Sequence, residues 1–195
     1  WYMDEEDENH NPTGKRVTTN DYGSADYYYV NKSSLPKVYG GFNTSLSWKG
    51  FDLSAIFAYS IGGYIYNRDI TMILHNGSLE GRDWSTEILK RWTPDNRNTD
   101  VPALSTTTNN WNSASTRFLQ NNSYMRLKNL TLSYNLPKQW ISKLSLSSVQ
   151  VYVQGDNLFT IHRNQGLDPE QGITGITYYR YPAMRTISGG INVSF

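Results

Sequence analysis

Residues 185–195 read Arg-Thr-Ile-Ser-Gly-Gly-Ile-Asn-Val-Ser-Phe, and every second position from Ile187 to Phe195 is apolar or glycine. The positions between them carry only threonine, serine, glycine and asparagine. Successive side chains of a β-strand point to opposite faces of its sheet, so this alternation predicts a strand with one apolar and one polar face.

The same alternation occurs in four earlier stretches. We expect strands at about 38–48, 51–61, 124–136 and 149–161, in addition to 185–195. Lys49-Gly50 between the first two predicts a tight hairpin turn. In the third strand, the even positions run from Arg126 and Lys128 into leucines and are assigned to one face. The sequence therefore predicts an all-β fold, an antiparallel meander of about five strands.

The connections between these strands differ greatly in length. They cover residues 49–50, 62–122, 137–148 and 162–184. In a meander, alternate connections lie at opposite ends of the sheet. One end is therefore expected to carry short links and the other large loops, an asymmetry that is typical of transmembrane β-barrels. A soluble β-sandwich with one large loop also has amphipathic strands and remains an alternative.

Outside the strands, the sequence predicts mostly loop. Residues 1–37 are expected to be an extracellular loop region, like the other long loops of such a barrel, with a solvated acidic run at 4–8 favoured over a cation site. The acidic run lacks the alternating ligands of a calcium loop. Inside the longest connection, the spacing of apolar residues over 82–92 predicts a short helix, and a helical turn is expected near Trp140.

The composition excludes several kinds of site. The net charge is +1, which argues against a nucleic-acid partner. There is no cysteine, and the three histidines are far apart, so cysteine chemistry and common zinc motifs are excluded. We recognise no catalytic, metal or cofactor-binding set and expect no enzyme activity.

Average hydropathy does not decide the relation to a membrane. The mean hydropathy is −0.61, and no stretch approaches the roughly 20 apolar residues of a membrane helix. Asparagine, serine and threonine exceed a quarter of the chain. Strands of a barrel alternate, however, so a low average is also compatible with a membrane β-barrel.

The final strand and several other segments resemble a known family. Gly190, Val193 and Phe195 follow the pattern of the C-terminal signal that outer-membrane assembly machinery reads. Residues 123–137, SYMRLKNLTLSYNLP, resemble the SYLRLKNLTLGYTLP segment of the SusC/RagA family of TonB-dependent outer-membrane transporters. Residues 91–102, RWTPDNRNTDVP, and 151–160, VYVQGDNLFT, resemble two further segments of that family, as do shorter matches at 49–53 and 181–186.

This resemblance implies a fold and a function. The chain would be the C-terminal part of a barrel of about 22 strands with a plugged lumen, in the outer membrane of a Gram-negative bacterium, with a periplasmic C-terminus. The whole protein would import oligosaccharides or oligopeptides with a SusD-like surface lipoprotein, powered through TonB. The lipid bilayer would contact the apolar face. The family's DxNGDGxID segment is missing from residues 9–35, so no cation site is transferred.

Three tryptophans of the long connection are candidate contact residues. Trp84, Trp92 and Trp111 are expected to pack the loop or contact the lipoprotein, in preference to stacking on a sugar cargo. The polar strand faces are expected to line the lumen, where exchangeable hydrogen bonds suit a polar oligomeric cargo. A soluble carbohydrate-binding β-sandwich and a hydrolase domain are the alternative functions.

Overall fold

The structure is a computed structural model that describes residues 1–75, 81–105, 112–170, 172–177 and 179–195. The chain forms two compact units. The first comprises Trp1–Lys32, Tyr66–Leu119 and Ile176–Tyr179. The second comprises Ser33–Ile65, Gln120–Gly175 and Arg180–Phe195.

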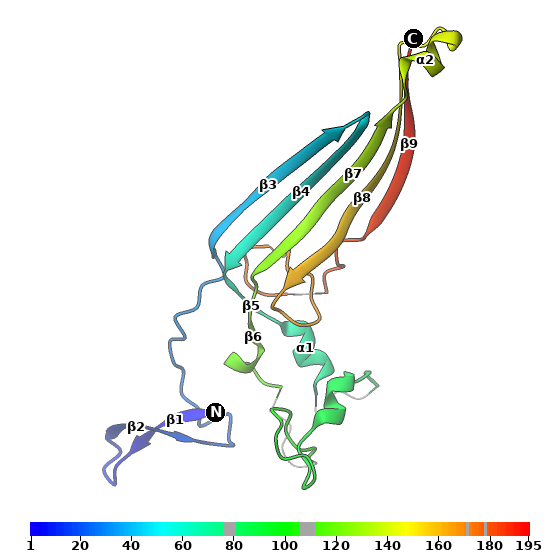
Figure 1. Ribbon diagram of the computed structural model, residues 1–195. Helices are drawn as coiled ribbons and strands as arrows, with labels where there is room; N and C mark the ends of the chain where they lie inside the picture. The colour runs from blue at the N-terminus through cyan, green and yellow to red at the C-terminus, as the bar shows by residue number, and fades with distance from the viewer. Residues whose placement is uncertain (76–80, 106–111, 171, 178) are drawn as a thin grey trace. The chain divides into compact units, whose positions relative to one another are not determined.

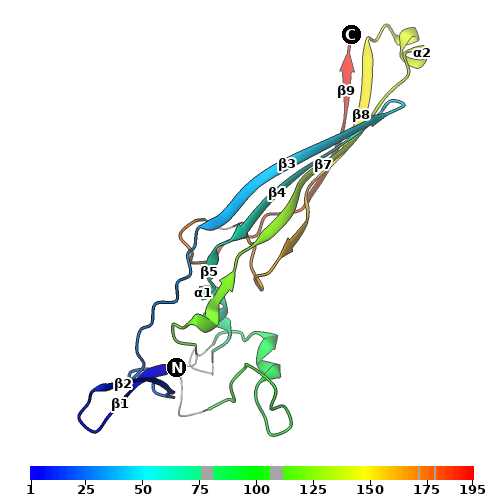
Figure 2. The ribbon, with the colours of Figure 1, turned by 60° about the vertical axis from the view of Figure 1, so that its left-hand side comes forward.

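A five-stranded antiparallel sheet forms the second unit (Figure 1). Its strands, in spatial order, are β3 (Pro36–Trp48), β4 (Phe51–Gly62), β7 (Tyr124–Asn135), β8 (Ser148–His162) and β9 (Thr186–Ser194). Spatial order follows chain order, so the predicted all-β meander is confirmed. Figure 2 shows the twist of these strands, which side-chain and carbonyl sterics impose on β-sheets.

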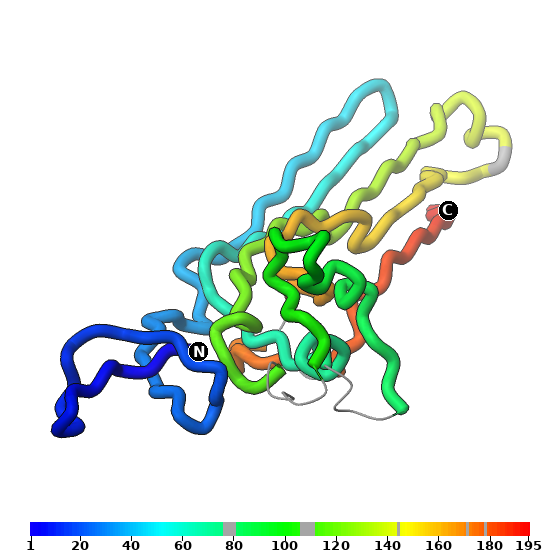
Figure 3. Tube along the Cα trace, turned by 90° about the horizontal axis from the view of Figure 1, so that it is seen from below, coloured from blue at the N-terminus to red at the C-terminus, as the bar shows by residue number. Residues whose placement is uncertain are grey.

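The short links lie together at one end of the sheet. Lys49 and Gly50 form the predicted tight turn, with φ of 48° and 88°, and Trp48 pairs with Phe51 beside it. The link from β7 to β8 contains α2 (Lys138–Ile141) and η3 (Ser142–Leu144), which confirms the expected helical turn. Figure 3 shows both hairpin tips at the same end of the sheet.

One face of the sheet is apolar and exposed. Phe42 stacks on Phe57 at 4.7 Å between ring centroids, and Phe51 contacts Tyr134 at 4.5 Å. Exposed members of this apolar face are Phe42, Leu46, Trp48, Phe51, Leu53, Leu132, Val151, Val153, Phe159, Ile161, Ile187 and Ile191. Soluble monomers rarely expose so large an apolar surface, so this face is expected to need a non-aqueous neighbour.

A bulge in β7 corrects the predicted face of its first residues. The register with both neighbouring strands shifts between Leu127 and Asn129. Such a shift reverses the alternation of side chains. Arg126 therefore lies on the polar face with Asn129, and Leu127 lies on the apolar face. The assignment of Arg126 and Lys128 to the face of the leucines was wrong, because simple alternation does not detect a bulge.

The first unit contains a hairpin where a loop was predicted. Strand β1 (Tyr2–Glu6) pairs with β2 (Pro12–Thr18), and Asp4 lies opposite Arg16. The turn is organised by Asp7, whose carboxylate accepts the backbone N–H of Asn11 and of Asn9. These bonds hold the pKa of Asp7 below its ordinary value. The acidic composition of β1 does not predict a strand, because the groups that bind its carboxylates lie outside the acidic run.

Short helices occupy parts of the long connection. They are α1 (Arg68–Ile73), η1 (Thr86–Lys90) and η2 (Thr116–Phe118), while β5 (Tyr64–Tyr66) and β6 (Leu119–Asn121) pair with each other. The helix expected over 82–92 is shorter than predicted and is a 3₁₀ turn capped by Ser85. Helix α1, which the sequence did not predict, is preceded by the N-cap residue Asn67, whose side chain accepts the Ile70 N–H. No helix in the described ranges is long and apolar enough to cross a membrane.

Candidate functional site

A row of hydrogen bonds crosses all five strands on the polar face, near the short links. Ser47 of β3 donates to Asp52 of β4. Asn135 Nδ2 of β7 donates to the other oxygen of Asp52 at 2.7 Å, and Gln150 Nε2 of β8 donates to Asn135 Oδ1 at 3.2 Å. Asn192 Nδ2 of β9 reaches Gln150 Oε1 at 3.2 Å. Each strand thus contributes one side chain to a continuous polar row.

A second polar cluster lies nearer the middle of β7 and β8. Asn129 Nδ2 donates to Asp156 Oδ1 at 2.7 Å, and Gln154 Nε2 lies 3.1 Å from Asp156 Oδ2. Thr131 donates to Asn129 Oδ1 at 2.9 Å. Amides therefore surround the carboxylate of this cluster. A surface of this kind offers many hydrogen-bonding groups and little net charge.

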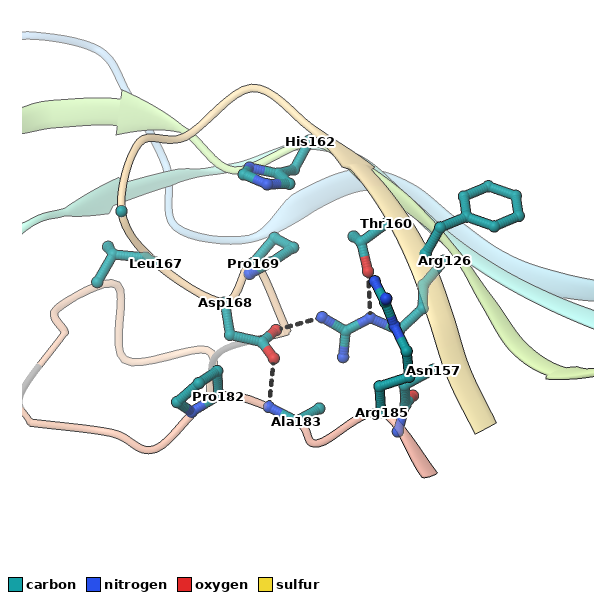
Figure 4. Close-up of a pocket in the computed structure, with 12 residues that line it drawn as sticks. Arg126, Asn157, Thr160, His162, Leu167, Asp168, Pro169, Pro182, Ala183 and Arg185 are labelled. Atoms are coloured by element: carbon teal, nitrogen blue, oxygen red, sulfur yellow. Dashed lines mark hydrogen bonds and ion pairs between the residues drawn. The ribbon is translucent and has the colours of Figure 1, made fainter. Parts of the chain in front are cut away.

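Arg126 organises the other end of the polar face. Its Nε donates to Thr160 Oγ1 at 2.8 Å, its Nη2 to Asp168 Oδ1 at 2.6 Å and its Nη1 to Glu170 Oε2 at 2.7 Å. Lys128 Nζ also binds Glu170, at 2.8 Å. The close-up in Figure 4 shows Asp168 reaching Arg126 from the loop that follows β8.

Backbone groups complete the surroundings of Asp168. Its Oδ1 accepts the Glu170 N–H at 2.9 Å, and its Oδ2 accepts the Ala183 N–H at 2.6 Å. Burial raises the pKa of Asp168, but these two backbone bonds and the Arg126 guanidinium outweigh burial and lower it below its ordinary value. Asp168 is therefore ionised at neutral pH and forms a charged pair with Arg126.

A hollow of about 670 Å³ lies beside this ion pair. Its lining includes Arg126, Asp168, Thr160, His162 and Arg185, together with Pro169. The hollow is open to the surroundings and combines ionic, hydroxyl and imidazole groups. Sequence reasoning missed the whole arrangement. The matching i, i+2 spacing of Arg126 with Lys128 and of Asp168 with Glu170 was the only signal for it.

The predicted assembly-signal residues all lie on or just after β9. Gly190 is covered by the ring of Tyr152, whose Oη would lie 2.7 Å from an added Cβ. Val193 pairs with Val149 near the short-link end, and Phe195 is 92% exposed beyond the last strand residue. Gly190 and Val193 thus lie in β9 and Phe195 directly follows it, and the role of the three residues in assembly stays a prediction.

Two of the three predicted tryptophans are half-exposed in the first unit. Trp84 packs edge-on against His75, with ring centroids 5.3 Å apart, and the backbone N–H of Trp92 donates to the backbone oxygen of Val101 at 2.8 Å. Their exposed fractions are 41% and 43%, so each ring is partly packed and partly available. Trp111 lies outside the described residues.

Comparison with known proteins identifies the family. No family profile matches the chain. TonB-dependent receptor P3 of Formosa agariphila is 35% identical over 80% of this chain and 16% of its own length. SusC of Bacteroides thetaiotaomicron is 27% identical over 100% of this chain and 19% of its own. The chain belongs to the SusC/RagA family of TonB-dependent receptors.

Solved structures of this family agree with the fold. The RagAB peptide importer in its closed-closed state matches with a TM-score of 0.77 and 34% identity over 98% of this chain and 20% of that chain. Its open-open state matches with a TM-score of 0.76 and 35% identity over 92% of this chain and 19% of that chain. The chain thus spans about a fifth of the length of these relatives. The expectation of an all-β portion of a SusC/RagA barrel is confirmed.

Proposed function

We propose that this chain is part of the barrel wall of an outer-membrane importer that moves oligosaccharides or oligopeptides into a Gram-negative bacterium. The observation that carries the proposal is the contrast between the two faces of one sheet. Hydrogen-bonded amides and hydroxyls cover one face, and exposed aliphatic and aromatic side chains cover the other. Such a sheet separates a watery lumen from lipid.

The polar face suits the passage of a polar oligomer. Its two carboxylates, Asp52 and Asp156, already accept amide hydrogen bonds. Passing hydroxyl or amide groups can therefore exchange hydrogen bonds with this wall without meeting an unpaired charge that would hold them tightly. The similarity to the RagAB peptide importer supports peptide as a cargo class. Glycan is proposed as the second cargo class from the resemblance to the SusC/RagA family.

The proposed partners are those that the family resemblance implies. We assign to the whole protein a SusD-like surface lipoprotein, energy transfer from TonB, and insertion by the outer-membrane assembly machinery with the C-terminus in the periplasm. Within this chain, the half-exposed rings of Trp84 and Trp92 are the proposed lipoprotein contacts. Gly190, Val193 and Phe195 are the proposed assembly signal.

A soluble carbohydrate-binding β-sandwich is the competing function. It would have to bury the apolar face against a second sheet, and the described residues contain no such second layer. The relatives support the importer instead.

Deletion of the gene for the full-length receptor tests the proposal. We expect the deletion strain to lose growth on at least one member of a panel of oligosaccharides and oligopeptides supplied as sole carbon source. The wild-type gene should restore growth only when TonB is present. Recovery of the receptor in the periplasm or medium, or growth that is independent of TonB, would contradict the proposal.

A tryptophan pair tests the lipoprotein contact. Trp92→Ala in the tagged full-length receptor is expected to reduce co-purification of the lipoprotein. Trp140→Ala is the matched control, because Trp140 is 65% exposed but lies at the short-link end. Equal co-purification of both variants would show that Trp92 only packs its loop.

A further inference from the structure

The loop after β8 is tied down across the polar face of the sheet. Residues 163–170 of this loop are called the strap here. Arg126 and Lys128 of β7 bind its Asp168 and Glu170 at 2.6–2.8 Å. Since Arg126 shares its face with Asn129, the strap lies over the polar side of the sheet and away from the apolar side (Figure 4).

Neutral hydrogen bonds hold the strap at further points. Asn122 Nδ2 donates to Pro169 O at 2.9 Å, and Asn164 Nδ2 donates to Asn122 Oδ1 at 3.0 Å. The Gln165 N–H donates to Gln120 Oε1 at 2.9 Å. The strap is thus connected to the segment that leads into β7 as well as to β7 itself. A loop with this many anchors is expected to keep one conformation.

The ion pairs that hold the strap, called the anchor, contain equal numbers of positive and negative charges. Two cations, Arg126 and Lys128, face two carboxylates, Asp168 and Glu170. The Arg126 and Asp168 side chains are only 4% and 7% exposed. Loss of one partner would leave a charge that is out of water and uncompensated, which strongly destabilises such a pair. The pair therefore favours the closed strap over any arrangement that separates the two residues.

We propose that the strap is a fixed constriction on the lumen wall that limits the size of the cargo passing along this part of the barrel. The inference rests on the proposed function, because it takes the polar face to line the lumen. Arg126 acts as a positioning residue that holds the strap, and Asp168 and Glu170 are its counterparts. An extended oligomer that follows this stretch of the polar face from the long-loop end meets the strap before the cluster around Asn129.

The double variant Asp168→Asn/Glu170→Gln tests whether the anchor holds the strap. These substitutions keep the side-chain shapes and remove both negative charges. In cells that carry the full-length receptor, we expect trypsin to cleave after Arg163 about tenfold faster, the change that a loss of 1.4 kcal/mol in protection produces. Glu87→Gln is the control, since it removes a carboxylate from an exposed ion pair with Lys90.

Thiol labelling tests whether the strap restricts access. Thr131→Cys places a reporter on the polar face, further along β7 than the strap, in a segment without native cysteine. The full-length receptor is treated with N-ethylmaleimide or with a polyethylene-glycol maleimide of several kilodaltons. With the strap anchored, only the small reagent should react quickly. In the double variant, labelling by the bulky reagent should rise several-fold and labelling by the small one by less than twofold.

The outcomes separate this inference from the proposed function. If the small reagent never labels the Thr131→Cys reporter, the polar face does not line a watery lumen and the proposed function fails. If the small reagent labels the reporter but the bulky reagent gains nothing from the double variant, the constriction is refuted. Should the double variant not reach the membrane, Glu170→Gln alone is used, whose carboxylate is 37% exposed. A smaller change of the same sign then supports the proposal, and no change overturns it.

Discussion

Replacing Leu130 by arginine tests the two-faced sheet at its most sensitive point. Strand β7 has 12 residues, which at a rise of about 3.4 Å and a tilt of about 40° span roughly 31 Å along the membrane normal. Tyr134, which contacts Phe51 at 4.5 Å, is taken as the interfacial aromatic. Leu130 lies about 10 Å deeper along the normal, close to the middle of an apolar band about 25 Å tall.

The expected loss of stability in Leu130→Arg follows from that depth. An arginine at the midplane of the lipid face destabilises a membrane barrel by about 2–4 kcal/mol. This corresponds to a roughly 30- to 700-fold shift of the unfolding equilibrium. Thr131→Arg is the matched control on the next residue. It loses the 2.9 Å hydrogen bond to Asn129, which is worth about 1 kcal/mol, and otherwise projects into the polar face.

Urea titration of the full-length receptor in liposomes measures the difference. The folded fraction is followed by heat-modifiable migration on gels. We expect a clearly lower midpoint for Leu130→Arg than for Thr131→Arg. A larger loss for Thr131→Arg would mean that the faces are assigned the wrong way round. Equal, small losses would refute a lipid environment for the apolar face.

Three further predictions concern single residues. Gly41→Ala should lower the free energy of unfolding by about 1–3 kcal/mol in urea titrations, since its Cβ would lie 2.8 Å from the backbone oxygen of Phe57. Ser45→Ala in the same strand should leave the free energy of unfolding nearly unchanged, and equal urea midpoints for the two variants would disprove the close contact. The pKa of Asp168 in the folded state lies below its ordinary value of 3.8. The stability that Asp168 contributes to the folded state is therefore complete above that value, and it is lost only as the pH falls through the lower folded pKa. Hydrogen exchange of the Ala183 amide, corrected for intrinsic rates, should therefore show constant protection from pH 8 to pH 5, and a loss within that range would refute this assignment. Phe195→Ser should lower the amount of folded receptor in the outer membrane while Ser194→Ala should not, and equal amounts for both would remove Phe195 from the assembly signal.

The sequence predicted which types of side chain form the candidate site, but it did not predict which of them contact one another. The alternation that places Gln150 and Asn192 on one face also predicts a polar wall. It does not predict that their side chains join Asn135 in a row across strands, because pairing of residues far apart in sequence depends on register. The assembly residues were proposed from a resemblance, and the tryptophans from their place in the longest connection.

The sequence by itself determined the five strands of the large sheet and, with one exception, their faces. A pleated strand turns alternate side chains to opposite sides, so a period of two is enough to separate the residues of β3, β4, β8 and β9 into apolar and polar sets. The family was also evident in the sequence, because its motifs are local and ordered.

Only the tertiary structure decided the features that depend on distant partners. The bulge between Leu127 and Asn129 places Arg126 on the polar face, and only then does Arg126 meet Asp168, 42 residues away in sequence. The β1–β2 hairpin likewise depends on the pairing of β1 with β2, in which Asp4 lies opposite Arg16. Local alternation and composition contain neither, because each is stabilised by contacts that exist only once the chain has folded.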